Sequence, residues 1–256
     1  MLITASEIIK NSWETYSKNW KKLFPYVVLM FITSAALTII GFAGLKIEAL
    51  VINKNVVLLN NLVVAALDVA ILLFTLWTTV ALFKNLRQVV ENKEMISIKE
   101  SYFQTSKYLW PIIWTSILVF LAVLAGFFLL LIPALIFAIW FTYVFYIVIF
   151  EDKKGVSALK ESKTLVTGRW WKTLWLLLAP AVFFGLIIVV IQMVISSPFG
   201  IFLDQESLAY ILTNSLLSTI VSAIFAPLTA LTTLYLYLSA KANPIEKPTV
   251  PPAEVK

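Results

Sequence analysis

Three polar side chains lie inside otherwise apolar stretches: Asp68, Gln192 and Asn214. Asp68 is the only acidic residue within a segment predicted to cross a membrane, where a carboxylate is costly enough to indicate a function. All three fall at comparable depth in their segments. They could therefore form one polar layer that binds a proton, an ion or a polar headgroup. The alternatives are a solvated helix end or hydrogen bonds between helices.

A second candidate site is a basic cluster next to paired tryptophans. We expect the headgroups of anionic lipids to bind here, since each cation contributes about 1 kcal/mol near a negatively charged leaflet. The alternative is the ordinary excess of Lys and Arg on the cytoplasmic side of a membrane protein. The cluster comprises Lys153, Lys154, Lys160, Lys163, Arg169 and Lys172, and the headgroup candidates are Lys160, Arg169, Trp170, Trp171 and Lys172.

The sequence lacks most residues that carry catalysis. It has no cysteine and no histidine, which removes thiolate nucleophiles, imidazole bases and Cys/His metal sites. Only seven glycines are present, and none forms a phosphate-binding loop. We predict no catalytic residue, no metal, no cofactor and no enzymatic activity.

The composition predicts an all-α polytopic membrane protein. Hydrophobic residues make up 61% of the chain, charged residues 13%, and the mean hydropathy is +0.92. The run 109–150 has no charged residue and would be roughly 63 Å long as one helix, about twice the bilayer core, so it must cross twice. We place a hairpin at Ile132-Pro133, with 134–150 as the second arm. The six predicted spans lie in 24–44, 62–83, 109–150 (two spans), 173–195 and 211–238.

The charges predict the orientation. Of the 20 Lys and Arg residues, all except Lys46 and Lys54 lie in the N-terminal segment, in 84–108, in 151–172 or after the last span. By the positive-inside rule these segments face the cytoplasm, which puts both termini there and makes 45–61 and 196–210 external loops. We expect a protein of the plasma membrane. The net charge of +6 marks a membrane side and indicates no nucleic-acid partner.

A short pattern recurs before three of the spans: IKNS at 9–12, IKES at 98–101 and LKES at 159–162. We expect an amphipathic interfacial helix on the cytoplasmic surface at each place. Thr4 with Glu7, and Ser97 with Glu100, are capping-box patterns at two of the expected helix starts. The pattern suggests three parallel repeat units, 1–94, 95–154 and 155–240, within one transmembrane domain 1–240, with chance similarity as the alternative. Residues 241–256 read as a proline-rich, disordered cytoplasmic tail.

The segment 146–178 carries a recognisable set of residues: Glu151, Lys154-Gly155, Ala158, Ser162, Gly168 and Trp170-Trp171, preceded by Leu131-Ile132-Pro133. It resembles the signature of the membrane domain associated with glycerophosphodiester phosphodiesterases and its stand-alone prokaryotic relatives. Relatives often have glycine where this chain has Ala134. The resemblance implies a six-helix membrane module of no established activity, which in some proteins accompanies a catalytic barrel that this sequence lacks.

Two functional hypotheses stay open. The first is a non-enzymatic membrane module that organises lipids, or membrane or cytoplasmic partner proteins, through its surface helices. The alternative is a subunit of a small-molecule or ion transporter, with the polar layer near Asp68 lining its pathway.

Overall fold

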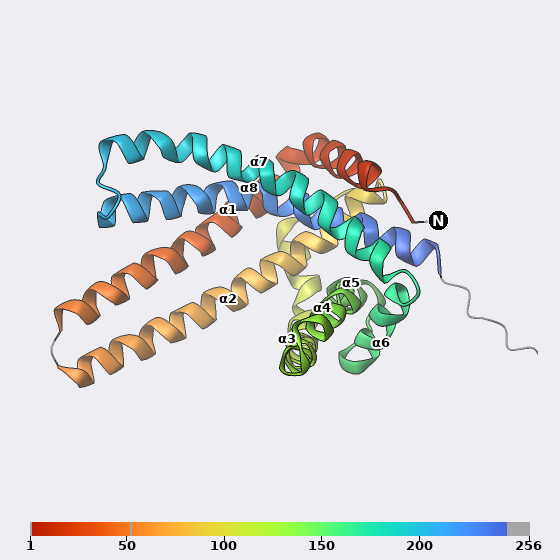
Figure 1. The fold of residues 1–256 in the computed structure, drawn as a ribbon, viewed down its shortest axis with the longest axis horizontal. Helices are drawn as coiled ribbons and strands as arrows, with labels where there is room; N and C mark the ends of the chain where they lie inside the picture. The colour runs from red at the N-terminus through yellow and green to blue at the C-terminus, as the bar shows by residue number, and fades with distance from the viewer. Residues whose placement is uncertain (1, 52, 245–256) are drawn as a thin grey trace, which may run out of the picture.

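The computed structural model describes residues 2–51 and 53–244, and within them the chain is helical with no strand (Figure 1). The all-α prediction is therefore confirmed. Thr4 and Glu7 form the expected capping box, and the Ser97 side chain accepts a hydrogen bond from the Glu100 amide. The helices are α1 (Ala5–Leu50), α2 (Lys54–Val90), α3 (Ile98–Leu129), α4 (Leu131–Trp140), α5 (Val144–Glu151), α6 (Gly155–Val166), α7 (Trp170–Phe202) and α8 (Leu208–Ala242).

Among the described residues, six helical segments are long and apolar enough to cross a membrane, as the sequence predicted for a multi-pass membrane protein. They are Ala5–Glu48, Lys54–Val90, Ile98–Phe128, Leu131–Glu151, Trp170–Phe202 and Leu208–Ala242. The prediction of long external loops at 45–61 and 196–210 is wrong. Helix α1 continues to Leu50 and α7 to Phe202, so only short turns separate them from α2 and α8. Apolar side chains such as Leu58 and Phe199 make these positions favourable as helix in lipid.

The spans are arranged as three helical hairpins, α1–α2, α3–α4 and α7–α8. In Figure 1 the turns of α1–α2 and α7–α8 lie at the same end of the molecule but apart from each other, and we call this the distal end. The opposite end holds α6, the start of α1 and the end of α8, and we call it the basic end because it carries Lys153, Arg169 and Lys241. Figure 1 looks almost along α3–α4 while showing the other hairpins from the side, so α3–α4 runs crosswise to them.

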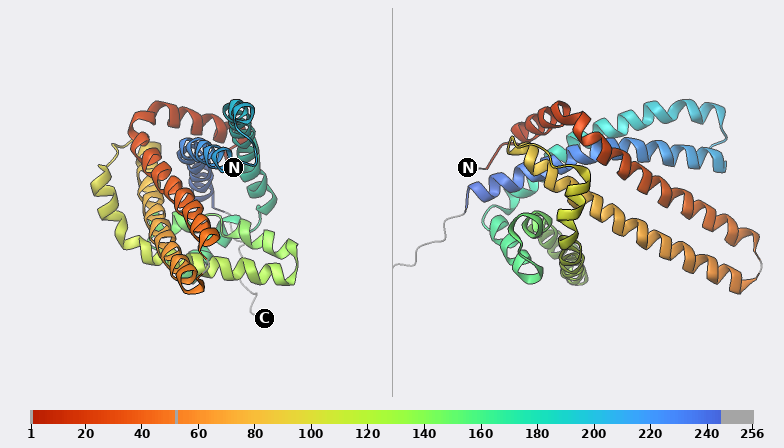
Figure 2. Two further views of the ribbon diagram at one scale, coloured as in Figure 1. Left: turned by 90° about the vertical axis from the view of Figure 1, so that its left-hand side faces the viewer. Right: turned by 180° about the vertical axis from the view of Figure 1, so that it is seen from behind.

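Two of the predicted surface helices are continuous with the spans that follow them. The first two expected surface helices are not separate elements, because α1 and α3 each continue through a proline, Pro25 and Pro111. The start of α1 (red) and its remainder (orange) run in different directions in Figure 2, as expected of a proline bend. The third, α6, is separate, since Gly168 adopts a φ of 87° in the turn before α7.

The core lies at the basic end, around the second half of α8. Leu228, Leu231 and Leu234 are completely buried there, and Leu23 of α1 and Ile147 of α5 are equally buried in the same apolar cluster. The predicted tail 241–256 begins inside α8, which continues to Ala242, and residues 245–256 lie outside the described residues.

The α3–α4 hairpin turns at Leu130, before the predicted Ile132-Pro133. Pro133 instead occupies the first turn of α4, where its missing N–H leaves no helical hydrogen bond unmade. The predicted second arm 134–150 lies within one candidate span, Leu131–Glu151, in which a turn at 141–143 separates α4 from α5. A Cβ added at Gly126 would lie 2.9 Å from the backbone of Ala134, so only glycine permits this close approach of the two helices.

Gly126→Ala should therefore weaken the hairpin. Backbone atoms cannot move aside as a flexible side chain can, so we expect a loss of about 1–3 kcal/mol and a lower midpoint of heat unfolding in detergent, followed by circular dichroism. Gly185→Ala in α7 is the matched control, because no atom lies within 4 Å of its added Cβ. Equal midpoints for the two variants would contradict the close contact.

Candidate functional site

Helix α6 is held at the basic end by residues of the signature segment. Gly155 opens the helix with a φ of 51°, and its amide donates to Thr115 Oγ1 of α3 at 2.9 Å. Ser162 is completely buried, donates to the Trp140 carbonyl at 2.7 Å and accepts from the Tyr143 amide at 3.2 Å. These residues fix the position of α6, so the part of the signature that they form is structural.

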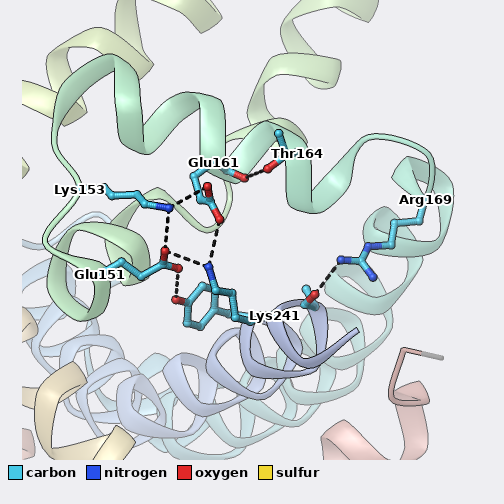
Figure 3. Close-up of polar contacts among 8 residues, drawn as sticks. Glu151, Lys153, Glu161, Thr164, Arg169 and Lys241 are labelled. Atoms are coloured by element: carbon cyan, nitrogen blue, oxygen red, sulfur yellow. Dashed lines mark hydrogen bonds and ion pairs between the residues drawn. The ribbon is translucent and has the colours of Figure 1, made fainter. Parts of the chain in front are cut away.

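Four charged residues form an ion-pair network between α5, α6 and α8 (Figure 3). Lys153 Nζ lies 3.1 Å from Glu151 Oε2 and 2.8 Å from Glu161 Oε2. Lys241 Nζ lies 2.9 Å from Glu151 Oε2 and 3.0 Å from Glu161 Oε1. The Tyr237 hydroxyl donates to Glu151 Oε1 at 2.8 Å. Because each lysine bridges both carboxylates, the network joins the consecutive helices α5 and α6 to α8, which is distant in sequence.

The network shifts the titration of its members outside the spans. Hydrogen bonds from Lys153, and then from Lys241, hold the pKa of the Glu161 carboxyl below its ordinary 4.5. The hydrogen bond with Glu161 is the largest cause that raises the pKa of Lys153. Both shifts favour the charged forms, and the network is ionised at neutral pH.

Arg169 lies in the predicted lipid-binding cluster, but its donors are directed at the protein backbone. Its guanidinium donates to the carbonyls of Leu165 at 2.7 Å, Asn243 at 2.7 Å and Ala240 at 2.9 Å. These carbonyls belong to the last turns of α6 and α8, where helices leave acceptors unpaired. The guanidinium therefore joins two helix ends to the start of α7, which sequence reasoning did not foresee.

An apolar groove of 580 Å³ lies next to the remaining cluster, between α4 and the start of α7. The ring of Trp170 packs at right angles to that of Trp171, which is 77% exposed. At the rim, Lys163 Nζ lies 4.0 Å from the centre of the Trp140 ring, a cation–π contact. We call this the tryptophan groove, and its lining residues are Ile132, Leu135, Ile136, Trp140, Thr167, Gly168, Trp170 and Trp171.

The structure divides the predicted lipid-binding residues. Lys160 and Lys172 are exposed, Trp170 and Trp171 line the groove, and Arg169 holds helix ends. Sequence reasoning missed Trp140 as a partner of the pair. The available signal was that Trp140 stands within a long uncharged run, away from the other basic-end tryptophans.

The three intramembrane candidates lie in two hairpins. Gln192 of α7 donates to Ser218 of α8 at 3.1 Å, and Asn214 of α8 accepts from Ser196 of α7 at 2.7 Å. Asp68 lies on α2, and its Oδ1 is buried without a hydrogen-bond donor among the described residues. No hydrogen bond within the described chain joins Asp68 to Gln192 or Asn214, and these two amides act as rungs between α7 and α8.

The ion-pair network makes the stability of the folded protein depend on pH in the acidic range. Because the pKa of Glu161 is lowered in the folded protein, its contribution is complete above 4.5 and is lost as the pH falls through the lowered value. We expect the heat-unfolding midpoint in detergent to fall more steeply for the parent than for Glu161→Gln between about pH 5 and pH 3. Glu14→Gln is the control, since Glu14 and its partner Lys10 are both largely exposed. Parallel curves for the parent and Glu161→Gln would contradict a stabilising role.

Comparison with known proteins places the chain in a family. Residues 103–238 match the family described as a domain of unknown function (DUF7847), and no curated protein and no solved structure matches the chain. The resemblance to the membrane domain associated with glycerophosphodiester phosphodiesterases stays a prediction. The match contains the ion-pair residues Glu151 and Glu161 and all three tryptophans of the groove. Since it covers more than half of the 256 residues, the chain belongs to the DUF7847 family of unknown function.

Proposed function

We propose that this protein is a non-enzymatic module of the plasma membrane that binds anionic lipids at its basic end. An acyl chain lies in the tryptophan groove, and the headgroup lies beside Lys163 and Lys172. The observation that carries the proposal is an apolar groove with a lysine over one of its tryptophan rings. Its 580 Å³ is within the range of roughly 300–1,000 Å³ common for ligand pockets.

The distribution of charge supports the same site. Glu151 and Glu161 neutralise Lys153 and Lys241 in the ion-pair network. Lys160, Lys163 and Lys172 form no ion pair within the described residues and are exposed. This excess of positive charge next to an apolar groove matches an anionic headgroup with an attached chain. Lys163 therefore takes the place in the site that the sequence assigned to Arg169.

The proposed orientation follows from the same charges. The basic end faces the cytoplasm, with both termini on that side, since the positive-inside rule favours Lys and Arg there. The first part of α1, the first part of α3 and α6 lie at the membrane surface as amphipathic segments. The serines at the repeated positions, Ser12, Ser101 and Ser162, are each completely buried, which supports three related units.

A transporter with a polar layer at Asp68 is the less favoured hypothesis. Asp68 lies in the α1–α2 hairpin, whereas Gln192 and Asn214 bond within the α7–α8 hairpin. Within the described residues no hydrogen bond joins Asp68 to either amide, so the predicted polar layer has less support than the tryptophan groove.

Native mass spectrometry of the protein extracted with its own lipids tests the proposal. In Lys163→Gln/Lys172→Gln we expect anionic lipid binding to weaken about 30-fold, since each charge contributes roughly 1 kcal/mol. Trp171→Ala should also reduce lipid retention while leaving the charge unchanged.

The matched control is Lys21→Gln/Lys99→Gln, which removes two exposed lysines outside the groove. We expect it to retain its lipid. An equal loss in both double variants would mean that the lysines act only through overall charge, which would overturn the groove as a specific site.

A further inference from the structure

A second cavity, of 650 Å³, lies among α1, α2, α8 and the start of α5. None of its lining residues is charged, yet hydroxyl groups line it from several helices. We call it the hydroxyl cavity, and its hydroxyl residues are Ser34, Thr75, Thr79, Thr142, Ser218, Thr219, Ser222, Thr229 and Thr233, with Tyr146. From Ser218 to Thr233 it follows α8 for roughly 22 Å, most of the ~30 Å bilayer core.

The hydroxyls retain hydrogen-bonding capacity toward the cavity. Thr75, Thr79 and Thr219 each donate to a carbonyl one turn earlier in their own helix, which leaves the oxygen lone pairs free to accept. Ser222 and Thr229 are exposed although they lie in a membrane-crossing helix. At membrane depth, contact of exposed hydroxyl groups with water or a polar ligand costs less free energy than contact with acyl chains.

Toward the basic end the cavity is bordered by an aromatic stack, and two of its rings, Phe83 and Tyr146, line the cavity. The Tyr146 ring lies between Phe83, at a centroid distance of 5.0 Å, and Tyr237, at 5.4 Å, with both pairs stacked. Tyr237 in turn donates to Glu151 of the ion-pair network. The stack is therefore hydrogen-bonded to the ion-pair network through Tyr237.

Toward the distal end the boundary is weaker. Ser218, a lining residue, bonds to Gln192 through one neutral hydrogen bond. Figure 1 shows α1–α2 and α7–α8 diverging from the core toward their turns.

We propose that the hydroxyl cavity binds an uncharged, polyhydroxylated small molecule that enters from the distal end. The absence of charge among the lining residues excludes a good counter-ion for an anion or a cation, and free hydroxyl oxygens accept from the hydroxyl groups of a polyol. The site is separate from the tryptophan groove and does not depend on lipid binding there.

The chain has no cysteine, so single-cysteine variants give an unambiguous accessibility test. Ser222→Cys and Thr229→Cys are treated in sealed vesicles with a charged, membrane-impermeant methanethiosulfonate. We expect both to react from the distal side at least 10-fold faster than Leu72→Cys. Leu72 is 55% exposed but lies outside the cavity, and a thiol in lipid is rarely ionised. Asn53→Cys at the distal turn and Lys172→Cys at the basic end report the orientation of the vesicles.

Protection from the reagent tests the ligand class. Sorbitol should slow the labelling of Ser222→Cys, whereas gluconate, of similar size but negatively charged, should not. If Ser222→Cys and Thr229→Cys react no faster than Leu72→Cys, the cavity is not open to water and the proposal fails. Rapid labelling without protection by sorbitol, or with equal protection by gluconate, would overturn the polyol assignment.

Closure at the basic end is tested in the same vesicles. Ser222→Cys should be unreactive from the basic side, and adding Tyr146→Ala should make it reactive from both sides. Retained distal labelling of that double variant shows that the protein still folds. Basic-side labelling of Ser222→Cys with Tyr146 present would overturn the closure.

Discussion

The burial of the second half of α8 is the contact on which the rest of the structure depends. In lipid, apolar side chains gain little by leaving the solvent, so helices associate through close packing and interhelical polar contacts. The end of α8 provides both. Leu228, Leu231 and Leu234 are fully buried, and one turn separates Tyr237 from Lys241, both of which bind Glu151. The Ala240 carbonyl accepts from Arg169, and Ser239 accepts from the Ile3 amide. The first described residues and the residue before α7 are therefore also hydrogen-bonded to α8.

Hydropathy predicted the number of spans because the length of an apolar run is a property of the sequence alone. It did not predict helix continuity at Pro25 and Pro111. Each proline removes one backbone donor, but ending the helix in lipid would leave several more groups unpaired, so the helix bends and continues. The crosswise direction of α3–α4 was also beyond reach. The contact of Gly126 with Ala134 inside that hairpin and the break at 141–143 escaped prediction because neither alters hydropathy.

The sequence indicated where in the chain the candidate site lies, but not which partners its side chains contact. Lys160, Lys172, Trp170 and Trp171 lie at the end of the bundle that carries the positive charge. The role of Arg169 could not be predicted. Its guanidinium binds carbonyls at two helix ends, and the sequence does not show that the end of α8 lies within its reach. The hydroxyl cavity was missed for another reason. Serine and threonine have intermediate hydropathy, and only the helical spacing of Ser218, Ser222, Thr229 and Thr233 indicates that they share a face.

The two ends of the bundle are held by interactions of different strength. At the basic end, charge-assisted hydrogen bonds of 2.8–3.1 Å join Glu151, Lys153, Glu161 and Lys241, and such bonds are roughly twice as strong as neutral ones. At the distal end, α7 and α8 are joined by two neutral rungs, Gln192 with Ser218 and Ser196 with Asn214, and those four residues lie on one hairpin. Any relative motion of the hairpins is therefore opposed least at the distal end. The ion-pair network lies at the strongly held end, and Ser218 places the hydroxyl cavity next to the weakly held one.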